Sequence, residues 1–216
     1  MLSSMPNKHL ILLISLLILL PLLGCRTATS NVYVSPTIPV DGIEPGDIAF
    51  RLGRTLHSSL IASAGDSLSS FSHVGIIVER DGELAVIHIE PSSTNDSIRR
   101  ESIGEFFQGD RSAAGAIFRV ENLDDVKLST ILGHAERIYN SRILFDHDYM
   151  LSDATRMYCT ELIEHIYSHC GISLSRGMTR SLPLVKEPVI LPADMAQNPM
   201  LKCVWSYRDL GSLPAR

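Results

Sequence analysis

A cysteine at the start of a helix-like segment is the residue of this chain best suited to nucleophilic chemistry. Counting from Cys159, apolar residues follow at positions +3, +4, +7 and +8, which is the stripe of an amphipathic helix over Cys159–Tyr167. Asp153 and Thr155, just upstream, are candidate N-caps. A thiol at a helix N-terminus feels the positive end of the helix dipole, which favours the reactive thiolate. The alternative is a small core residue, because free cysteines are among the most buried residue types.

A histidine within a predicted strand is the candidate base. Nucleophilic cysteine chemistry needs a base within hydrogen-bond reach and a third group that orients the base. His73 lies in the apolar run Phe71–Val78, which has the composition of a β-strand. Strand alternation places it on one face with Gly75 and Ile77. The alternative is a core histidine that is hydrogen-bonded to the backbone.

Two polar residues on the next predicted strand are candidates for the orienting group. The turn at 80–82 joins Phe71–Val78 to the run Leu84–Ile89 as an antiparallel hairpin. His88 lies in this second run, and Glu90 follows two residues later on the same face. The hairpin can bring either residue alongside His73. For each, the alternative is a satisfied polar residue at the end of a strand.

Other chemistry-bearing residues give weaker signals. Tyr158 can place a hydroxyl or backbone group near the thiolate, or can simply pack at the helix start. His165 and His169 have the i, i+4 spacing that can hold a metal ion, next to Cys170. No further ligand stands out beside them, so we predict a solvent-exposed face and no metal or cofactor. The remaining histidines of the mature chain are interpreted as surface residues: His57, His134 and His147.

The surrounding pattern predicts one α+β domain with an antiparallel sheet. The predicted strands are 48–51, 71–78, 84–89 and 116–120, and the predicted helices are 55–64, 103–107, 126–139 and the cysteine helix. After Gly171 the chain carries Pro183, Pro188, Pro192 and Pro199, so mostly loop with short elements is expected there. Phosphate-binding glycine loops and a GxSxG serine elbow are absent from the sequence.

The N-terminus has the pattern of an export signal. Lys8 precedes the apolar run Leu10–Leu23, which is too short for a comfortable membrane span. The sequence Leu22-Leu23-Gly24-Cys25 resembles the lipobox of bacterial lipoproteins, in which the cysteine is lipidated. We therefore predict a signal peptide at 1–24, a lipidated Cys25 with a Pro-rich tether to residue 45, and a domain at 46–216. A plain signal peptide or an uncleaved anchor is the alternative.

The net charge and the number of cysteines argue against two further classes of protein. The net charge of −5 is not that of a nucleic-acid-binding chain. If Cys25 carries lipid, Cys159, Cys170 and Cys203 remain, and three thiols cannot all pair within one chain. A disulfide framework is therefore not expected, which favours a functional free thiol.

Four segments together resemble a known superfamily. They are Gly46–Phe50, Ser72–Val78, Val86–His88 and Tyr158–Glu161, spread over residues 45–170. In this order the set resembles the NlpC-like superfamily of papain-like cysteine amidases. It is most similar to the circularly permuted branch of YaeF/YiiX-like lipoproteins and, more remotely, to lecithin:retinol acyltransferases. In unpermuted members the cysteine helix precedes the histidine strands, whereas here it follows them.

The resemblance implies a fold, a site and a reaction. The expected fold is a permuted papain-like α+β fold whose antiparallel sheet packs against the cysteine helix. Cys159 matches the nucleophile, His73 the base and His88 the orienting residue, with Glu90 as the alternative third residue. Backbone N–H groups at the helix start, with Tyr158 beside them, would stabilise the oxyanion.

The implied enzyme is a cysteine peptidase or amidase held in the bacterial cell envelope by lipid on Cys25. It would cleave an amide in a cell-wall peptide or an N-acyl amino acid through a thioester, without a cofactor. Arg26 lacks the acidic character of an inner-membrane retention signal, which favours the periplasmic side of the outer membrane. The rivals are a thioesterase or acyltransferase acting on lipid, and a non-catalytic envelope lipoprotein that binds peptide or lipid.

Overall fold

The computed structural model describes residues 33–65, 71–92 and 96–209, and the account below is confined to them. The predicted signal peptide and Cys25 lie outside the described residues. The described part of the predicted tether, residues 33–45, contacts the domain. The Ser35 hydroxyl accepts the Gly109 N–H at 3.0 Å, and the Ile43 side chain is buried.

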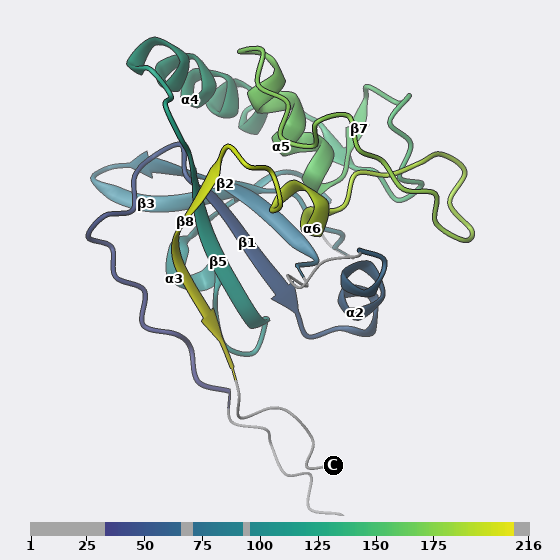
Figure 1. Ribbon diagram of the computed structural model, residues 1–216, viewed down its shortest axis with the longest axis horizontal. Coiled ribbons are helices and arrows are strands. Elements are labelled where there is room, and N and C mark those ends of the chain that lie inside the picture. Colours follow the sequence, from purple (N-terminus) through teal and green to yellow (C-terminus); the bar gives the residue numbers. More distant parts are fainter. Residues whose placement is uncertain (1–32, 66–70, 93–95, 210–216) are drawn as a thin grey trace, which may run out of the picture. The chain divides into compact units, whose positions relative to one another are not determined.

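One six-stranded antiparallel sheet forms the centre of the fold (Figure 1). Its strand order is β4-β3-β2-β1-β5-β8. The strands are β1 (Ile48–Gly53), β2 (His73–Arg80), β3 (Glu83–His88), β4 (Arg99–Ser102), β5 (Ser112–Val120) and β8 (Leu201–Arg208). A short parallel pair, β6 (Leu144–Phe145) and β7 (Arg156–Met157), precedes the cysteine helix.

The β2–β3 hairpin fixes the register of the two strands that carry the histidines. Asp81 and Gly82 both have positive φ, at 55° and 83°, as a two-residue type I′ turn requires. Arg80 pairs with Glu83 next to this turn, and Ile76 pairs with Ile87 further along the ladder. The hairpin predicted from the apolar runs is confirmed.

Helices cover both faces of the sheet (Figure 1). The helices are α2 (Leu56–Ser63), α3 (Ile103–Phe106), α4 (Asp125–Tyr139), α5 (Cys159–Ser168) and α6 (Pro192–Met195). α4 and α5 pack with one face, and α3 packs with the other. No helix in the described ranges combines the length and the hydrophobicity that crossing a bilayer needs. The predicted α+β class, with an antiparallel sheet against the cysteine helix, is confirmed.

The apolar stripe of α5 is buried against β2 and β3, as predicted. Leu162, Ile163, Ile166 and Tyr167 are all fully buried. Burial of such side chains contributes about 1.5–3 kcal/mol each. The Tyr167 hydroxyl also donates a hydrogen bond to the carbonyl of Gly46 just before β1, at 2.5 Å. These contacts fix α5, and with it Cys159, relative to the sheet.

The predicted caps of this helix are wrong. α5 begins at Cys159 with Tyr158 as its N-cap residue, and the strand β7 separates it from Asp153 and Thr155. The Asp153 carboxylate instead accepts both the N–H and the hydroxyl of Thr155, at 2.9 and 2.6 Å. Asp and Thr satisfy local turns as readily as helix starts, which explains the error.

The C-terminal region contains more regular structure than its prolines suggested. Besides α6, it supplies β8, which pairs with β5 along almost its whole length. The run Cys203–Tyr207 is rich in residues that favour strands, and that signal was outweighed by the prolines before it. The segment between α5 and β8 is mostly loop, as expected, and it folds back against the start of α5.

Candidate functional site

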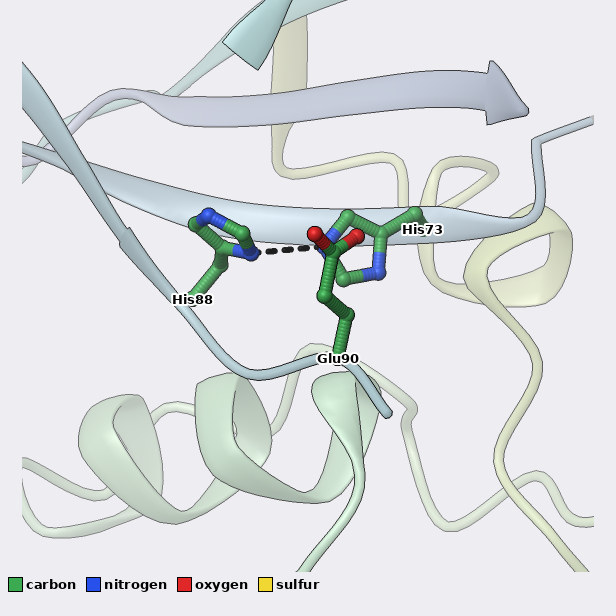
Figure 2. Close-up of side chains that lie close together, drawn as sticks. All are labelled: His73, His88 and Glu90. Carbon is green, nitrogen blue, oxygen red and sulfur yellow. Dashed lines mark hydrogen bonds between the residues drawn. The ribbon is translucent and has the colours of Figure 1, made fainter. Parts of the chain in front are cut away.

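Two buried histidine rings meet edge to face between β2 and β3 (Figure 2). Nε2 of His73 lies 2.9 Å from Nδ1 of His88, a hydrogen-bond distance. His73 is 8% exposed and His88 is fully buried. The Phe106 ring from α3 stacks on His73 with 5.7 Å between ring centroids. The hairpin register and this aromatic packing hold both rings in fixed orientations.

A carboxylate behind His88 sets the tautomers of both rings. Nε2 of His88 lies 3.3 Å from Oε2 of Glu101 on β4, with its N–H not aligned well enough for a full hydrogen bond. Burial acts to raise the pKa of Glu101, but His88 and Arg111 lower it to about 2, so this group is ionised. The His88 nitrogen that faces it therefore carries the proton. His73 must then donate its Nε2–H to Nδ1 of His88, which leaves Nδ1 of His73 as a free acceptor.

Both histidines are expected to be neutral Nε2–H tautomers at pH 7. Burial, with the charge of Arg51 next in size, holds the pKa of His73 well below 6.5. Burial also lowers the pKa of His88. A base with a lowered pKa stays unprotonated until the pH falls below that pKa. We therefore expect kcat/KM to fall on the acid side only below pH 6.5. Long-range ¹H–¹⁵N correlation spectra at pH 7 would contradict this assignment if either ring were doubly protonated.

Cys159 opens α5 and lies against the start of β2. Its side chain is half-buried and lines one cavity of about 300 Å³ together with His73 and Arg51. Burial raises the pKa of the thiol to about 11, although the backbone N–H groups of Val74 and Thr160 and the charge of Arg51 act to lower it. The expected lowering by the helix start is therefore present, but burial outweighs it. With these pKa shifts, the Cys159 thiol and the His73 imidazole are both neutral at pH 7.

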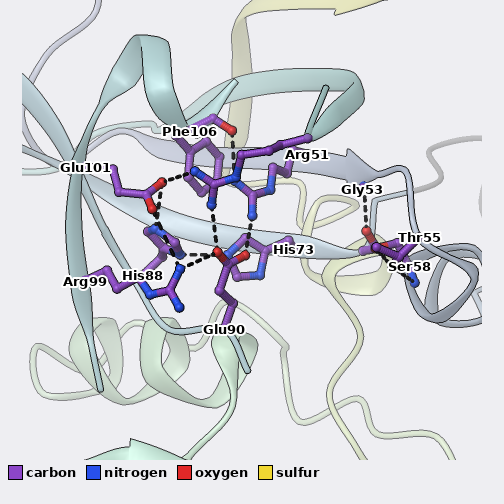
Figure 3. Close-up of polar contacts among 12 residues, drawn as sticks. Arg51, Gly53, Thr55, Ser58, His73, His88, Glu90, Arg99, Glu101 and Phe106 are labelled. Atoms are coloured by element: carbon purple, nitrogen blue, oxygen red, sulfur yellow. Dashed lines mark hydrogen bonds and ion pairs between the residues drawn. The ribbon is translucent and has the colours of Figure 1, made fainter. Parts of the chain in front are cut away.

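Glu90 lies beside the histidines but is bound by three arginines (Figure 3). Arg51 donates to Oε2, while Arg99 and Arg111 donate to Oε1 at 2.9 and 2.6 Å. The buried Arg51 also donates to the carbonyl of Phe106 at 2.8 Å and lies over its ring. Two residues were candidates for the group that orients the base. The ring of His88 contacts His73, whereas the carboxylate of Glu90 accepts hydrogen bonds from the arginines.

His73, His88 and Glu90 lie as close together as the ligands of a metal ion, but their arrangement does not suit one (Figure 2). One ligand atom each of His73, His88 and Glu90 lies within 4.8 Å of the others. A metal ion needs imidazole lone pairs aimed at one point, whereas these two rings face each other across a hydrogen bond. Three guanidinium groups around Glu90 also oppose a cation there. The residues therefore do not fit a metal ion in this arrangement.

Gly75 lets β3 approach β2 closely enough for the histidine contact. A Cβ at this position would lie 2.5 Å from Cγ1 of Val86, 2.9 Å from the Ile87 carbonyl oxygen and 3.0 Å from Cβ of His88. Gly75→Ala is expected to destabilise the fold by about 1–3 kcal/mol through overpacking and to lower kcat. Gly133→Ala, in the interior of α4 with 3.7 Å to its nearest neighbour, is the control and should be neutral or stabilising. Urea denaturation giving equal stability for Gly75→Ala and wild type would refute this.

Tyr158 supports the site through packing. Its ring is buried, and its hydroxyl accepts the N–H of Ile190 at 3.0 Å. The Thr160 hydroxyl donates to the Ile190 carbonyl at 2.8 Å. Two side chains that flank Cys159 thus fasten the C-terminal segment to the start of α5.

The structure also brings in residues that the sequence did not single out. Glu101 stands in the charged run Arg99–Glu101, which has no strand pattern, and Arg51 and Arg111 read as ordinary charges. Only the pairing of β4 with β3, with His88 opposite Arg99, shows that these charges converge. The one available signal is a charged run that begins ten residues after the end of the predicted strand 84–89.

His134, His165 and His169 lie together where α4 packs on α5, and one of them is not at the surface as predicted. His165 and His169 are exposed, as expected, but His134 on α4 is buried, so its surface assignment is wrong. Its ring stacks on His169 with 4.3 Å between centroids. The packing of α4 on α5 covers His134, which the pattern of α4 alone does not reveal.

Cys159, Cys170 and Cys203 are all free thiols.

Comparison with known proteins places the chain in a family. Residues 42–205 match the model of Peptidase_C92, described as a permuted papain-like amidase enzyme of the YaeF/YiiX type. No curated protein gives a significant match. Among solved structures, the chain is similar to YiiX from Escherichia coli O157:H7, described as a metalloprotein, with a TM-score of 0.63 and 21% identity. That match covers 76% of this chain and 98% of the other.

The family model spans well over half of the chain, and the solved structure shares its fold. The order of the observed elements, with the histidine strands β2 and β3 before the cysteine helix α5, is the permuted order. The chain therefore belongs to the Peptidase_C92 family of permuted papain-like amidases.

Proposed function

We propose that the chain is a cysteine amidase in which Cys159 is the nucleophile, His73 the general base and His88 the group that orients His73. One observation carries the proposal. The thiol lies against the first residues of β2 in the cavity that His73 also lines, and the Nε2 side of His73 is already held by His88. The free Nδ1 of His73 is thereby available to the thiol.

The proposed reaction uses only these groups and water. His73 takes the proton of Cys159, and the thiolate attacks the amide carbonyl carbon. Backbone N–H groups at the start of α5 stabilise the oxyanion. The C–N bond breaks, the amine leaves with the proton from His73, and a thioester remains. Water, deprotonated by His73, then attacks the thioester, and the acid leaves as the thiol is restored.

Glu101 completes this arrangement as a positioning residue. Its carboxylate faces the protonated nitrogen of His88, and Arg111 fixes it with a 2.8 Å hydrogen bond. It thereby favours the tautomers that leave Nδ1 of His73 free. We assign no step to a metal ion, although YiiX is described as a metalloprotein. The N–H···N contact and the arginines around Glu90 support a site without one.

Trapping the thioester tests this function. The full chain is incubated with cell-wall peptides, N-acyl amino acids and the corresponding esters, then quenched in acid and analysed by mass spectrometry. We expect amide hydrolysis and an acyl adduct on Cys159, with Cys170 and Cys203 as internal controls, and neither result in Cys159→Ala. Hydrolysis of the esters alone would favour the lipid-enzyme alternative. The absence of any Cys159-dependent turnover or adduct would leave a binding lipoprotein instead.

We further propose that lipid on Cys25 anchors this enzyme in the cell envelope. The support is the lipobox-like sequence Leu22–Cys25 and the apolar run before it. Fractionation of cells that express the full chain should place it with the outer membrane, and Cys25→Ala should abolish labelling by a fatty-acid probe. Equal labelling of both forms would overturn the anchor.

A further inference from the structure

Helix α2 presents an uncharged surface with two exposed leucines. The segment 55–64, which includes both caps of the helix, contains no Asp, Glu, Lys or Arg, whereas 20% of the whole chain is charged. Leu56 and Leu60 lie one turn apart on the same face and are 87% and 71% exposed. Leu184, which lines one cavity together with Leu60, is fully exposed. Exposed apolar side chains that gather in this way indicate a contact surface.

The other side of α2 fixes the helix to the domain. The Thr55 hydroxyl accepts the Ser58 N–H at 3.0 Å and caps the helix. Ala62 is buried, and Ile61 packs against the core between the sheet and α5. The helix is thus a fixed part of the domain, and its leucines are left on the surface.

The tether enters the domain beside this helix. The ring of Tyr33, the first described residue, has its centroid 4.1 Å from the guanidinium carbon of Arg54. Arg54 directly precedes Thr55, the N-cap of α2. Seven residues, 26–32, separate Tyr33 from Cys25. The eight steps of an extended chain between the two span at most about 29 Å, so lipid on Cys25 would hold the start of α2 close to the bilayer.

A bilayer is the partner that this arrangement favours. Because the anchor makes docking intramolecular, the effective concentration of the lipid surface is high and a small apolar face suffices. The polar residues of α2 are serine and histidine, so no ionic charge has to leave water. By contrast, Val126 on α4 is 76% exposed but lies between the charged Asp125 and Lys127.

We propose that Leu56, Leu60 and Leu184 form a docking face that inserts into the bilayer in which lipid on Cys25 is anchored. This inference rests on the proposed anchor and adds an orientation of the domain to it. Residues of α2 also line the cavity that contains Cys159. Docking therefore places the reaction at the membrane surface.

Fluorescence quenching tests the docking face on the full chain reconstituted in vesicles. Tryptophan is introduced as Leu56→Trp or Leu60→Trp, with Val126→Trp as the control of matched exposure, and the signal of the native Trp205 is subtracted. Phosphatidylcholine with brominated acyl chains should quench the tryptophan at 56 and 60 about twofold or more and should spare position 126. Equal quenching at all three positions, or none at 56 and 60, overturns the docking face. Protection from aqueous acrylamide without quenching by lipid would reveal a protein partner or a second copy instead, and would also overturn it.

Charge substitutions on the docking face supply a second measurement. With Leu184→Trp as the reporter, Leu56→Asp and Leu60→Asp should each shift the docking equilibrium about tenfold or more towards the undocked state. Val126→Asp is the control and should leave the quenching unchanged. Equal quenching in all of these variants would show that the leucines do not drive docking and would refute the proposal.

The anchor and the docking face can fail separately. If mass spectrometry finds lipid on Cys25 while the tryptophans at 56 and 60 stay unquenched, the docking face is wrong and the anchor stands. If Cys25 carries no lipid and these tryptophans are still quenched, the anchor is wrong and the docking face stands as a membrane contact of its own.

Discussion

Replacing Cys159 by alanine is expected to lower kcat/KM for amide hydrolysis by at least about 10³-fold, and His73→Ala is expected to cost a similar factor. The two side chains act as one unit, so the double variant should be no worse than either single variant. Steady-state kinetics on folded, purified variants measure this. Losses that multiply in the double variant would show that the two residues act independently.

The raised thiol pKa sharpens the expectation for His73→Ala. A thiol with a pKa of about 11 is ionised in only about one molecule in 10⁴ at pH 7, so without a base it is almost inactive. Activity of His73→Ala should therefore rise about tenfold per pH unit towards pH 11, whereas wild type should be nearly level above pH 7. Cys203→Ala, which removes an exposed thiol, is the control and should match wild type at every pH. A level profile for His73→Ala would contradict a role as base.

Much of the fold could be predicted because local patterns agree with the tertiary structure. The stripe on α5, the β2–β3 hairpin and α4 each carry a periodicity that needs no knowledge of distant contacts. β4 is different, because its sequence Arg-Arg-Glu-Ser is charged throughout and becomes a strand only by pairing with β3. No pattern within four residues could reveal this.

The candidate site could be predicted only in part, for a similar reason. Cys159, His73 and His88 stand out because a polar or reactive side chain interrupts an apolar pattern. Glu101 and the arginines occupy charged segments in which nothing is unusual, and their burial is a property of the assembled sheet. The pKa of Cys159 also differs from the prediction. The helix start alone would lower it, but burial of the thiol raises it.

Glu90→Gln is expected to destabilise the protein by about 3 kcal/mol while leaving kcat of the folded enzyme within a few-fold of wild type. Its carboxylate is the shared acceptor for Arg51, Arg99 and Arg111, and Arg51 is only 4% exposed. The amide of glutamine removes the negative charge and leaves three like charges close together. Loss of one partner in a buried ion pair costs far more than the pair itself contributes. Urea denaturation at pH 7 measures the effect.

The kinetic comparison decides between Glu90 and His88 as the partner of His73. His88→Gln should lower kcat about 10–100-fold, because the base loses its orientation and tautomer, whereas Glu90→Gln should act on stability. Asp81→Asn, which removes the exposed ion pair with Arg80, is the control for loss of a carboxylate and should change neither quantity. The opposite pattern, with Glu90→Gln stable but slow and His88→Gln fully active, would make Glu90 the orienting residue. Because the three arginines already use both oxygens of Glu90, we expect the stability effect to dominate.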